Sequence, residues 1–438
     1  MSALLRLEEV RERILAAVTG PLPAETVGVE EALGRVLAEP VHSATDLPPW
    51  DNSAMDGYAI RAADVAVASE AAPVRLTVIG EVAAGAAPGV VVTAGTAARI
   101  ATGALVPSGA DAVVPVELTT PLDGAGQAGP RGREASGQLP AWCLVHEAVP
   151  VGGSIRRRGE DLRAGSVVLA SGTEISAAGV AITAGSGVAT VRVHRRPRVA
   201  VLATGDEVRS PGEVLEPAGI PDANGPGLRA LVRTVGGEAL ALGVARDRLD
   251  DVVERLWSVV NEVDAIIVSG GVSVGPYDVV RLAFEAIGRV DFWRVAIQPG
   301  KPFAFGLADR AGDRPVLLFG LPGNPVSSFV TFELFVRPAL RRLAGHPDLF
   351  RPPDRAVLEA EVTKSHGRRA FIRVIAARST MGSPVRDERG RVVVRLAGGQ
   401  GSHMLTALAA ADALAVIPEA NDTLPAGSEV ELWWLDRA

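Results

Sequence analysis

The sequence contains almost no cysteine. Cys143 is the only one among 438 residues, so the chain cannot form an internal disulfide. Histidine is also scarce, and the spacing of the six histidines does not match that of zinc ligands. They occupy positions 42, 146, 194, 346, 366 and 403. We therefore expect no metal site built from cysteine and histidine.

Long apolar runs and charge of one sign are missing as well. Gly, Pro, Arg or Glu interrupts each apolar stretch before it reaches the length of a membrane span. The first eighteen residues follow the pattern of an amphipathic helix and not that of a signal peptide. The net charge is -7, with acids and bases mixed along the chain, which argues against a broad nucleic-acid surface. We expect a cytoplasmic protein that binds neither nucleic acid nor membrane.

Aromatic residues make up only 4% of the chain, whereas 47% of the residues are hydrophobic and 22% are charged. This composition is typical of folded α/β or α+β layers built from Ala, Val and Leu. A chain of 438 residues is too long for one hydrophobic core, so we expect about three or four domains. The predicted fold class is multidomain, α/β plus β.

The apolar pattern changes along the chain and suggests where these domains lie. Short Val- and Ile-rich runs between about Asp46 and Val145 predict a β-rich domain, in which the Gly-, Ala- and Pro-biased segment 121–140 is interpreted as a mobile hairpin insertion. Strand patterns alternate with amphipathic helices from about Arg198 to Leu343. Such alternation predicts a parallel sheet covered by helices on both faces. From Arg351 onward, short strand patterns predict another small β domain.

Two glycine-rich loops in the α/β region have the composition of a phosphate site. "IIVSGGVSVGPYD" places Gly270 and Gly271 between a strand and a helix, and "FGLPGNPVSS" does the same with Gly323 and Asn324. Bare backbone amides and the positive end of a helix can hold an anion there. A single loop of this kind is as often ordinary turn chemistry. Two loops at one sheet edge favour a ligand site, because ligands bind beyond the carboxyl ends of parallel strands.

Acidic residues follow neighbouring strands of the same region, namely Asp206, Glu207, Asp222 and Asp278. Each one alone is more often a helix N-cap than a ligand. Phosphates beside several carboxylates would be repelled unless a hard divalent cation lay between them, and Mg²⁺ accepts such a mixture of oxygens. We therefore expect a phosphate-bearing substrate bridged by a metal ion. Lys301, in a Gly- and Pro-rich loop, would add a fixed positive charge.

Another acidic segment, "DNSAMDGYAIRAAD" (51–64), has neither a helical nor a strand period through its middle. Together with seven other stretches it resembles the MoeA family of molybdopterin molybdenumtransferases, which includes the E domain of gephyrin. The eight stretches occur in the family's order and cover nearly the whole chain. The other seven are "IATGALVP", "SIRRRGEDLRAGSVVL", "LATGDEV", "VSGGVSVGPYD", "AIQPGKPFAFG", "LPGNPVSS" and "GGQGSHML".

The resemblance implies an elongated homodimer of four-domain subunits. The linking domain I would comprise 26–46 with 145–176, and the β-rich domain II 47–144. The molybdopterin-binding-like α/β domain III would comprise 1–25 with 177–345, and a small β-barrel-like domain IV 350–438. In such a dimer, domain II of one subunit faces domain III of its partner. The acidic loop around Asp56 would then complete a site that its own chain cannot close.

The resemblance also implies the reaction and its participants. Adenylylated molybdopterin and molybdate would be the substrates, Mg²⁺ the metal cofactor, and molybdenum cofactor and AMP the products. Transient contacts with the molybdopterin adenylyltransferase and with cofactor-accepting enzymes would follow. The sequence does not distinguish molybdate from tungstate, nor the carboxylates that ligate the metal from those that orient water.

Residue by residue, the resemblance assigns catalytic roles to Asp56, Asp161, Glu207, Asp222 and Asp278, with all of these except Asp161 as metal ligands. The expected substrate-binding residues are Thr102, Gly270, Gly271, Ser273, Asn324, Lys301, Pro302, Arg373 and Ser402. Among these, Lys301, Pro302, Arg373 and Ser402 match the molybdate pocket. Gln298 departs from the family, since many relatives have a lysine there.

Two other functions stay open on the sequence. Enzymes that adenylylate molybdopterin from ATP have similar glycine-rich and acidic loops, and consumption of ATP would distinguish them. The E domain of gephyrin also acts as a scaffold for membrane receptors. A scaffold role here would require a partner that binds after the acidic residues of the cleft are removed.

Overall fold

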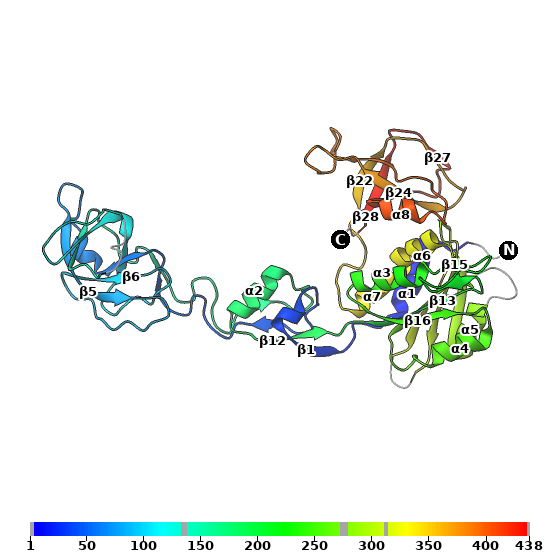
Figure 1. Cartoon of the computed structure of the whole chain (residues 1–438), viewed down its shortest axis with the longest axis horizontal. Coiled ribbons are helices and arrows are strands. Elements are labelled where there is room, and N and C mark those ends of the chain that lie inside the picture. Colours follow the sequence, from blue (N-terminus) through cyan, green and yellow to red (C-terminus); the bar gives the residue numbers. More distant parts are fainter. Residues whose placement is uncertain (1–3, 133–137, 272–278, 311–313, 436–438) are drawn as a thin grey trace.

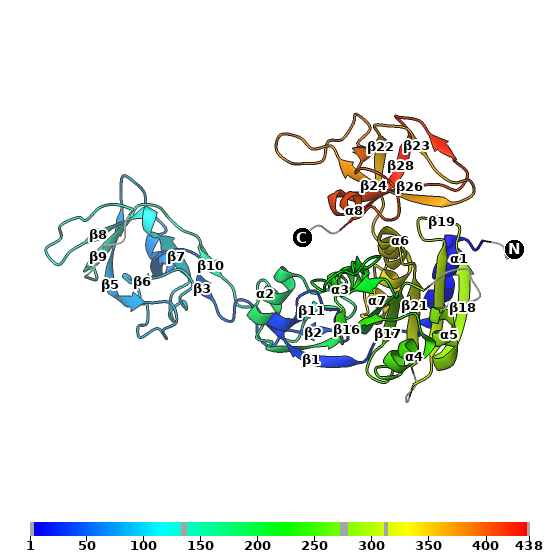
Figure 2. The same cartoon turned by 45° about the vertical axis from the view of Figure 1, so that its right-hand side comes forward.

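The computed structural model describes residues 4–132, 138–271, 279–310 and 314–435. The chain starts in the α/β domain with α1 (Leu7–Ala17), leaves it along an extended arm, and returns to it after residue 194 (Figure 1). Domain II forms the far end of this arm, and the small domain I lies between domain II and the α/β domain. The barrel domain sits on the α/β domain in both views (Figures 1 and 2). The order of the domains in space therefore differs from their order along the chain.

The α/β domain is built on a six-stranded sheet with the order β16-β13-β17-β21-β20-β18. The strands are β13 (Arg198–Thr204), β16 (Glu238–Ala245), β17 (Ala265–Ser269), β18 (Gly288–Arg294), β20 (Pro302–Ala308) and β21 (Val316–Leu321). The prediction of a parallel sheet is right for the first four strands in this order and wrong for β20, which runs antiparallel to both of its neighbours, β21 and β18. The reason is that the connections 295–301 and 309–315 are too short for a crossover, which needs about a dozen residues.

Helices cover both faces of this sheet because residues along each strand alternate between two cores. In β13, Val199 and Val201 face one core and Ala200 and Leu202 face the other. The helices over the first face are α1, α3 (Asn224–Thr234), α6 (Pro325–Thr331), the π-helical turn η4 (Phe332–Val336) and α7 (Arg337–Leu343). Those over the second face are α4 (Leu249–Trp257) and α5 (Val279–Ile287).

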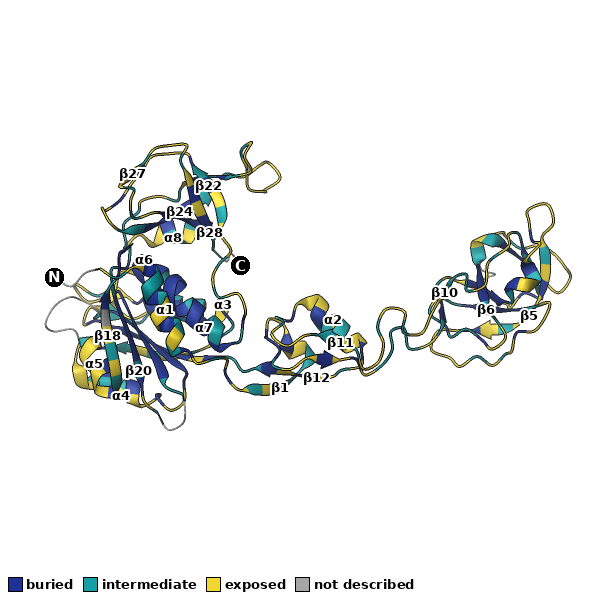
Figure 3. Cartoon of the chain, turned by 180° about the vertical axis from the view of Figure 1, so that it is seen from behind, coloured by how far each residue is buried: buried dark blue, intermediate teal, exposed yellow. Residues whose placement is uncertain are grey.

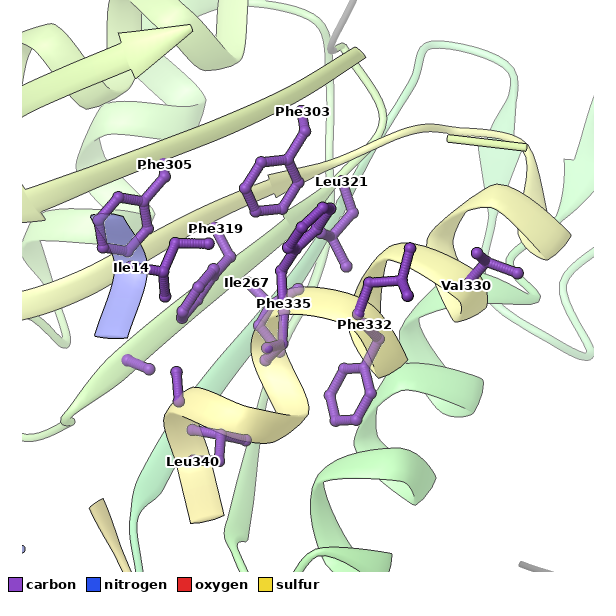
Figure 4. Close-up of a cluster of buried hydrophobic side chains, with 14 of the residues drawn as sticks. Ile14, Ile267, Phe303, Phe305, Phe319, Leu321, Val330, Phe332, Phe335 and Leu340 are labelled. Carbon is purple, nitrogen blue, oxygen red and sulfur yellow. The ribbon is translucent and has the colours of Figure 1, made fainter. Parts of the chain in front are cut away.

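The first core is rich in aromatic side chains. Figure 4 shows Phe303, Phe319 and Phe335 side by side between the sheet and η4, with the ring centroids of Phe303 and Phe335 4.6 Å apart. Figure 3 shows that the helices turn exposed residues outward and buried ones toward the sheet. This packing gives the strand ends a rigid base.

Domain I is a small unit of paired strands and one helix. Its elements are β1 (Ala24–Gly28), η1 (Val29–Ala32), β2 (Val41–His42), β11 (Val167–Leu169), α2 (Ala177–Gly185) and β12 (Thr190–His194). The expected boundary at 177 is wrong for α2 and β12, which pack here and not in the α/β domain. The reason is that β12 pairs antiparallel with β1 over its full length, so the chain re-enters the α/β domain only after His194.

Domain II is β-rich, as its sequence pattern predicts, and contains a six-stranded sheet with the order β7-β4-β6-β5-β9-β8. Its strands are β4 (Gly57–Ile60), β5 (Val74–Val82), β6 (Thr96–Ile100), β7 (Ala112–Pro115), β8 (Thr119–Leu122) and β9 (Trp142–Val145), with turns η2 (Ala62–Val65) and η3 (Val116–Leu118). A short pair, β3 (Asn52–Ser53) with β10 (Ile155–Arg156), joins it to the arm. In the segment 121–140, the described part is a hydrogen-bonded turn, and Arg131 ties it to Glu70.

The C-terminal domain is a closed barrel of five strands, β24-β25-β22-β28-β26, which closes because β24 also pairs with β26. Its elements are β22 (Asp354–Leu358), β23 (Val362–Thr363), β24 (Arg369–Ala376), β25 (Val392–Leu396), α8 (Leu405–Ala410), β26 (Ala413–Ile417), β27 (Thr423–Leu424) and β28 (Glu429–Trp434). Phe371, Leu414 and Val416 reach into the first core of the α/β domain. The two domains therefore share buried surface.

The helices of the described residues are all too short or too polar to span a lipid bilayer.

Candidate functional site

A cavity of about 580 Å³ opens at the carboxyl end of the parallel strands of the α/β domain. This is the edge of an open α/β sheet at which ligands bind. The lining comes from the segments that follow β13, β16, β17 and β21 and from the short strand β15 (Ile220–Pro221) with the residues after it, and one residue comes from the barrel domain. The lining includes Thr204, Glu207, Asp222, Asn224, Asp247, Ser269, Gly270, Gly271, Asn324 and His403.

The turn after β17 needs glycine at two positions. Gly270 has φ +107°, and a Cβ atom there would lie 2.3 Å from the carbonyl oxygen of Thr204. Gly271 has φ +60°, and its Cβ would lie 2.8 Å from Val280. Any side chain would force the backbone to shift, so the turn presents bare peptide groups to the cavity.

Asn224 ties three loops of the cavity together. Its side-chain nitrogen donates to the hydroxyl of Ser269 at 2.9 Å and to the carbonyl of Gly323 at 2.7 Å. Its side-chain oxygen is buried and has no hydrogen-bond partner in the described part of the chain. The cavity wall therefore carries an acceptor that a ligand donor would satisfy.

The acidic residues at this edge are crowded. Asp222 is buried, and its Oδ1 accepts the amide of Gly225 at 2.8 Å, the capping role common after a strand. The amide of Asp247 donates to Oδ1 of Asp206 at 3.3 Å. Asp247 remains exposed, but partial desolvation, followed by the charges of Asp206 and Glu207, raises the pKa of its carboxyl above the usual value. The described residues that line the cavity include neither lysine nor arginine, so the carboxylates lack a cationic partner there.

The structure brings together five of the residues expected from the sequence, namely Glu207, Asp222, Gly270, Gly271 and Asn324. Sequence reasoning missed two others in the same cavity. Asp247 follows β16, the strand beside β13, and its position at a strand end was the available signal. His403 belongs to the barrel domain, and no local pattern in the sequence links it to the cavity.

Asp56 and Thr102 form a separate group in domain II. Oδ1 of Asp56 accepts hydrogen bonds from the amide of Thr102 at 2.6 Å and from its hydroxyl at 2.8 Å. These bonds lower the pKa of the Asp56 carboxyl, and the backbone bond contributes most. Domain II lies at the far end of the arm in both views, well away from the cavity of the same chain (Figures 1 and 2).

Asp161 lies near the junction of domains I and II, where its amide donates to the carbonyl of Leu47 at 3.0 Å. The neighbouring Arg157 pairs with Asp51 at 2.6 Å, and both side chains are exposed. No contact joins Asp161 either to Asp56 or to the cavity within the residues that the structure describes.

The four residues of the expected molybdate pocket lie where the α/β domain meets the barrel. Lys301 and Pro302 precede or begin β20, and the pKa of Lys301 is lowered by desolvation and then by Arg294 and Arg368. The carbonyl of Ser402 accepts the amide of Val326 in α6 at 3.0 Å. The loop of Ser402 is thereby fixed to the start of α6, next to the cavity.

Arg373 is fully buried, with 0% exposure, and burial lowers the pKa of its guanidinium. Its Nη2 donates to the carbonyls of Gly399 and Gly401 at 3.1 and 3.2 Å. Nε and Nη1 find no hydrogen-bond partner among the described residues. The guanidinium therefore keeps two donors for a further acceptor, and its bonds to Gly399 and Gly401 support the loop that carries Ser402.

Gln298 does not act as a free polar group. Its Oε1 accepts the amide of Ser365 at 3.0 Å, and β19 (Ile297–Gln298) pairs with β24. In this chain the position therefore links the α/β domain to the barrel.

Two of the expected residues, Ser273 and Asp278, lie outside the described residues. Over the part that the structure describes, no three His, Cys, Asp or Glu side chains are gathered as a ready metal site. The carboxylates of the cavity would therefore need oxygens from a ligand or from another chain to surround a cation.

Three family models match consecutive parts of the chain. They are the MoeA N-terminal region (domain I and II) over 5–187, the probable molybdopterin binding domain over 200–342, and the MoeA C-terminal region (domain IV) over 355–435. Together they cover the arm, the α/β domain with the cavity, and the barrel.

Curated and solved relatives match over nearly the full length. Molybdopterin molybdenumtransferase 2 of Mycobacterium tuberculosis is 38% identical over 98% of this chain and 99% of its own. Molybdopterin molybdenumtransferase of Haemophilus influenzae is 33% identical over 98% of each chain. The crystal structure of a molybdopterin biosynthesis MoeA protein from Pyrococcus horikoshii is similar with a TM-score of 0.76 and 33% identity over 99% of each chain.

Proposed function

The chain belongs to the MoeA family, the molybdopterin molybdenumtransferases that carry out the molybdenum-insertion step of cofactor biosynthesis, and on this premise we propose that its cavity binds adenylylated molybdopterin. The observation that carries the proposal is the pairing of the Gly270–Gly271 turn with Glu207 and Asp222 at one sheet edge. The turn offers peptide groups to phosphate oxygens, and the carboxylates offer ligands to a cation.

A divalent cation fits this set of residues, because the cavity holds carboxylates without a cationic partner among its described lining. Partial desolvation and the charges of Asp206 and Glu207 raise the pKa of Asp247, because they disfavour its charged form. A bound cation would offset this electrostatic cost. We infer that Glu207 and Asp222 hold Mg²⁺ together with Asp56 of the partner subunit, and the resemblance adds Asp278. When bound, the cation neutralises charge on the phosphates and on the leaving AMP.

The homodimer is part of this proposal. Asp56 and Thr102 are hydrogen-bonded to each other at the end of the arm, away from the cavity of their own chain. An acidic group that is already oriented but faces no substrate site in its own chain suggests use by a second copy. A two-fold dimer would form two such composite sites.

Molybdate is proposed to bind at the junction of the α/β domain and the barrel. Arg373 has two unpartnered donors there, Lys301 supplies a second positive charge, and Ser402 and Pro302 border the same junction. A small dianion needs positive charge and donors at short range. The chain would thus hold molybdate next to the cavity and bring it to the dithiolene sulfurs mainly by positioning.

In the reaction, the residues of this chain bind and orient. The glycine turn would fix the phosphate groups, and the cavity acids with the partner's Asp56 would hold the cation, which would supply charge neutralisation there. Hydrolysis of the anhydride bond, in which water adds to one phosphate as AMP leaves, would make insertion of the metal effectively irreversible. The tungstate ion has nearly the same size and charge, and nothing in the described pocket selects against it.

We also propose a cytoplasmic location, with transient contacts to the enzyme that adenylylates molybdopterin and to the enzymes that accept the finished cofactor. These follow from the reaction, since a reactive cofactor is best passed on directly.

The direct test is to incubate the purified protein with adenylylated molybdopterin, Mg²⁺ and molybdate and to measure AMP. We expect release of AMP that depends on molybdate. Equal release without molybdate, or none at all, would contradict the proposed reaction. Consumption of ATP with release of pyrophosphate would point to the adenylylation step.

A further inference from the structure

The described lining of the cavity carries negative charge that the α/β domain does not balance with lysine or arginine. Its lining contains Glu207, Asp222 and Asp247, whereas the α/β domain contributes no lysine or arginine to the described wall. A phosphate-bearing ligand would meet three carboxylates there. The metal can neutralise only part of this charge, so a further positive or hydrogen-donating side chain is needed.

His403 is the one side chain of the described lining that can carry a positive charge, and it comes from the barrel domain. It is exposed, and neither of its ring nitrogens has a hydrogen-bond partner within the described residues. Its backbone carbonyl accepts the amide of Leu405 at the start of α8. The backbone thus has a structural role, whereas the imidazole is left for another contact.

The structure also holds the His403 ring in place. A Cβ atom at Gly401 would lie 2.8 Å from Cε1 of the ring, so the ring packs against the bare backbone of this glycine. The carbonyl of Gly401 accepts from the buried Arg373, and the carbonyl of Ser402 accepts from Val326 at the start of α6. The bond from Val326 therefore fixes the loop that carries His403 to α6 beside the cavity, and the bond from Arg373 fixes the same loop to the barrel.

We propose that His403 donates a hydrogen bond to a phosphate oxygen of the nucleotide part of the substrate, so that the barrel domain completes the cavity of the α/β domain. This inference rests on the proposed function, because it needs a phosphate in the cavity. Arg373 and Gly401 are then positioning residues for the imidazole. The arrangement gives the barrel a direct part in substrate binding beyond the molybdate junction.

The test uses the full-length protein, with AMP as the probe in the presence of Mg²⁺, and isothermal titration calorimetry. We expect His403→Ala to weaken AMP binding about tenfold, the usual effect of losing a hydrogen bond to a charged group. His403→Gln keeps an N–H donor of similar reach and should recover most of the loss. In turnover assays the effect should appear mainly in KM for the adenylylated substrate, with a smaller change in kcat.

The matched control is His366→Ala, which removes an exposed histidine of the same domain that pairs with Asp422 at 2.8 Å, away from the cavity lining. It should bind AMP as the wild type does. Wild-type affinity in His403→Ala, or an equal loss in His366→Ala, would overturn the role of His403. If the unmodified protein binds no AMP, the proposed function itself fails, so the two failures are distinguishable.

Discussion

At the end of the arm, Asp56 accepts two hydrogen bonds from Thr102, whereas at the cavity Asp247 lies beside Asp206 and Glu207 with no cation in the described lining. The first arrangement lowers the pKa of a carboxyl and the second raises it. The charged form of Asp56 is therefore stabilised by hydrogen bonds within its own domain. The charged form of Asp247 is disfavoured by its surroundings in the cavity.

This difference indicates what each region lacks. Domain II orients Asp56 through its bonds with Thr102, at the far end of the arm from the cavity of its own chain (Figure 1). The α/β domain has the glycine turn and the cavity but needs positive charge from outside its own wall. Asp56 of a second chain would add a further carboxylate to the cavity, so the proposed composite site requires a divalent cation shared by the two chains.

The largest effect on turnover should come from removing the charge of a carboxylate in the cavity. Glu207→Gln keeps the size of the side chain but removes a ligand charge, and we expect turnover to fall by about a hundredfold or more, since both metal affinity and charge neutralisation depend on it. The assay is molybdate-dependent release of AMP. Size-exclusion chromatography should show an unchanged dimer.

Glu238→Gln is the matched control, because Glu238 is exposed at the amino end of β16, the opposite edge of the same sheet. Its turnover should equal that of the wild type. Full activity in Glu207→Gln would show that the cavity carboxylates are not needed.

The next effect tests whether the glycine turn is built for close approach. Gly270→Ala should lower the free energy of unfolding of the α/β domain by about 2–4 kcal/mol, because it adds both a strained φ and a clash with the backbone of Thr204. Gly236→Ala has φ +81° but nothing within 4 Å of the added Cβ, so about 1–2 kcal/mol is expected. Urea denaturation measures both. Equal losses would mean that the clash is relieved at no cost.

The smallest expected effect is on the free energy of unfolding, and it compares the charge of Asp247 in the cavity with that of Asp56 in domain II. Because folding raises the pKa of Asp247, its charge costs stability that appears as pH rises above the unfolded pKa. Asp247→Asn should therefore stabilise the metal-free protein at pH 7 by a few tenths of a kcal/mol, and the gain should vanish near about pH 3.5.

The charge of Asp56, at the end of the arm, should have the opposite effect on the free energy of unfolding. Folding lowers the pKa of Asp56, so its charge contributes stability above the unfolded pKa, which is lost as pH falls through the folded pKa. Asp56→Asn should destabilise the protein slightly at pH 7. Thermal unfolding with a metal chelator present, at the two pH values, measures both variants; shifts of the same sign would remove the contrast.

Much of the cavity followed from local patterns. Glu207 follows β13, and Gly270 and Gly271 follow β17; the carboxyl ends of parallel strands meet at one edge, so the convergence of these residues needed no knowledge of the fold. The strand patterns did not reveal that β20 runs antiparallel to its neighbours β18 and β21, because such patterns carry no direction and only the short connections indicate it.

The residues that were missed depend on tertiary neighbours. Asp247 lies between Arg246 and Arg248, which resembles a solvated start of a helix, and only the placement of β16 beside β13 brings it to the cavity. His403 reaches the cavity through docking of the barrel, which rests on contacts such as Ser402 with Val326. Likewise, α2 and β12 belong to domain I because of a strand pairing with residues far away in the chain.

The most direct test of the composite site is a mixed dimer. Asp56→Asn and Glu207→Gln chains are expressed together with different affinity tags, and only dimers that carry both are purified. If each site uses Asp56 of one chain and Glu207 of the other, one of the two sites is intact, and the mixed dimer should show about half of the wild-type rate of AMP release while each parent dimer is nearly inactive. A mixed dimer as inactive as its parents would mean that every site is built within a single chain, and the account would be wrong.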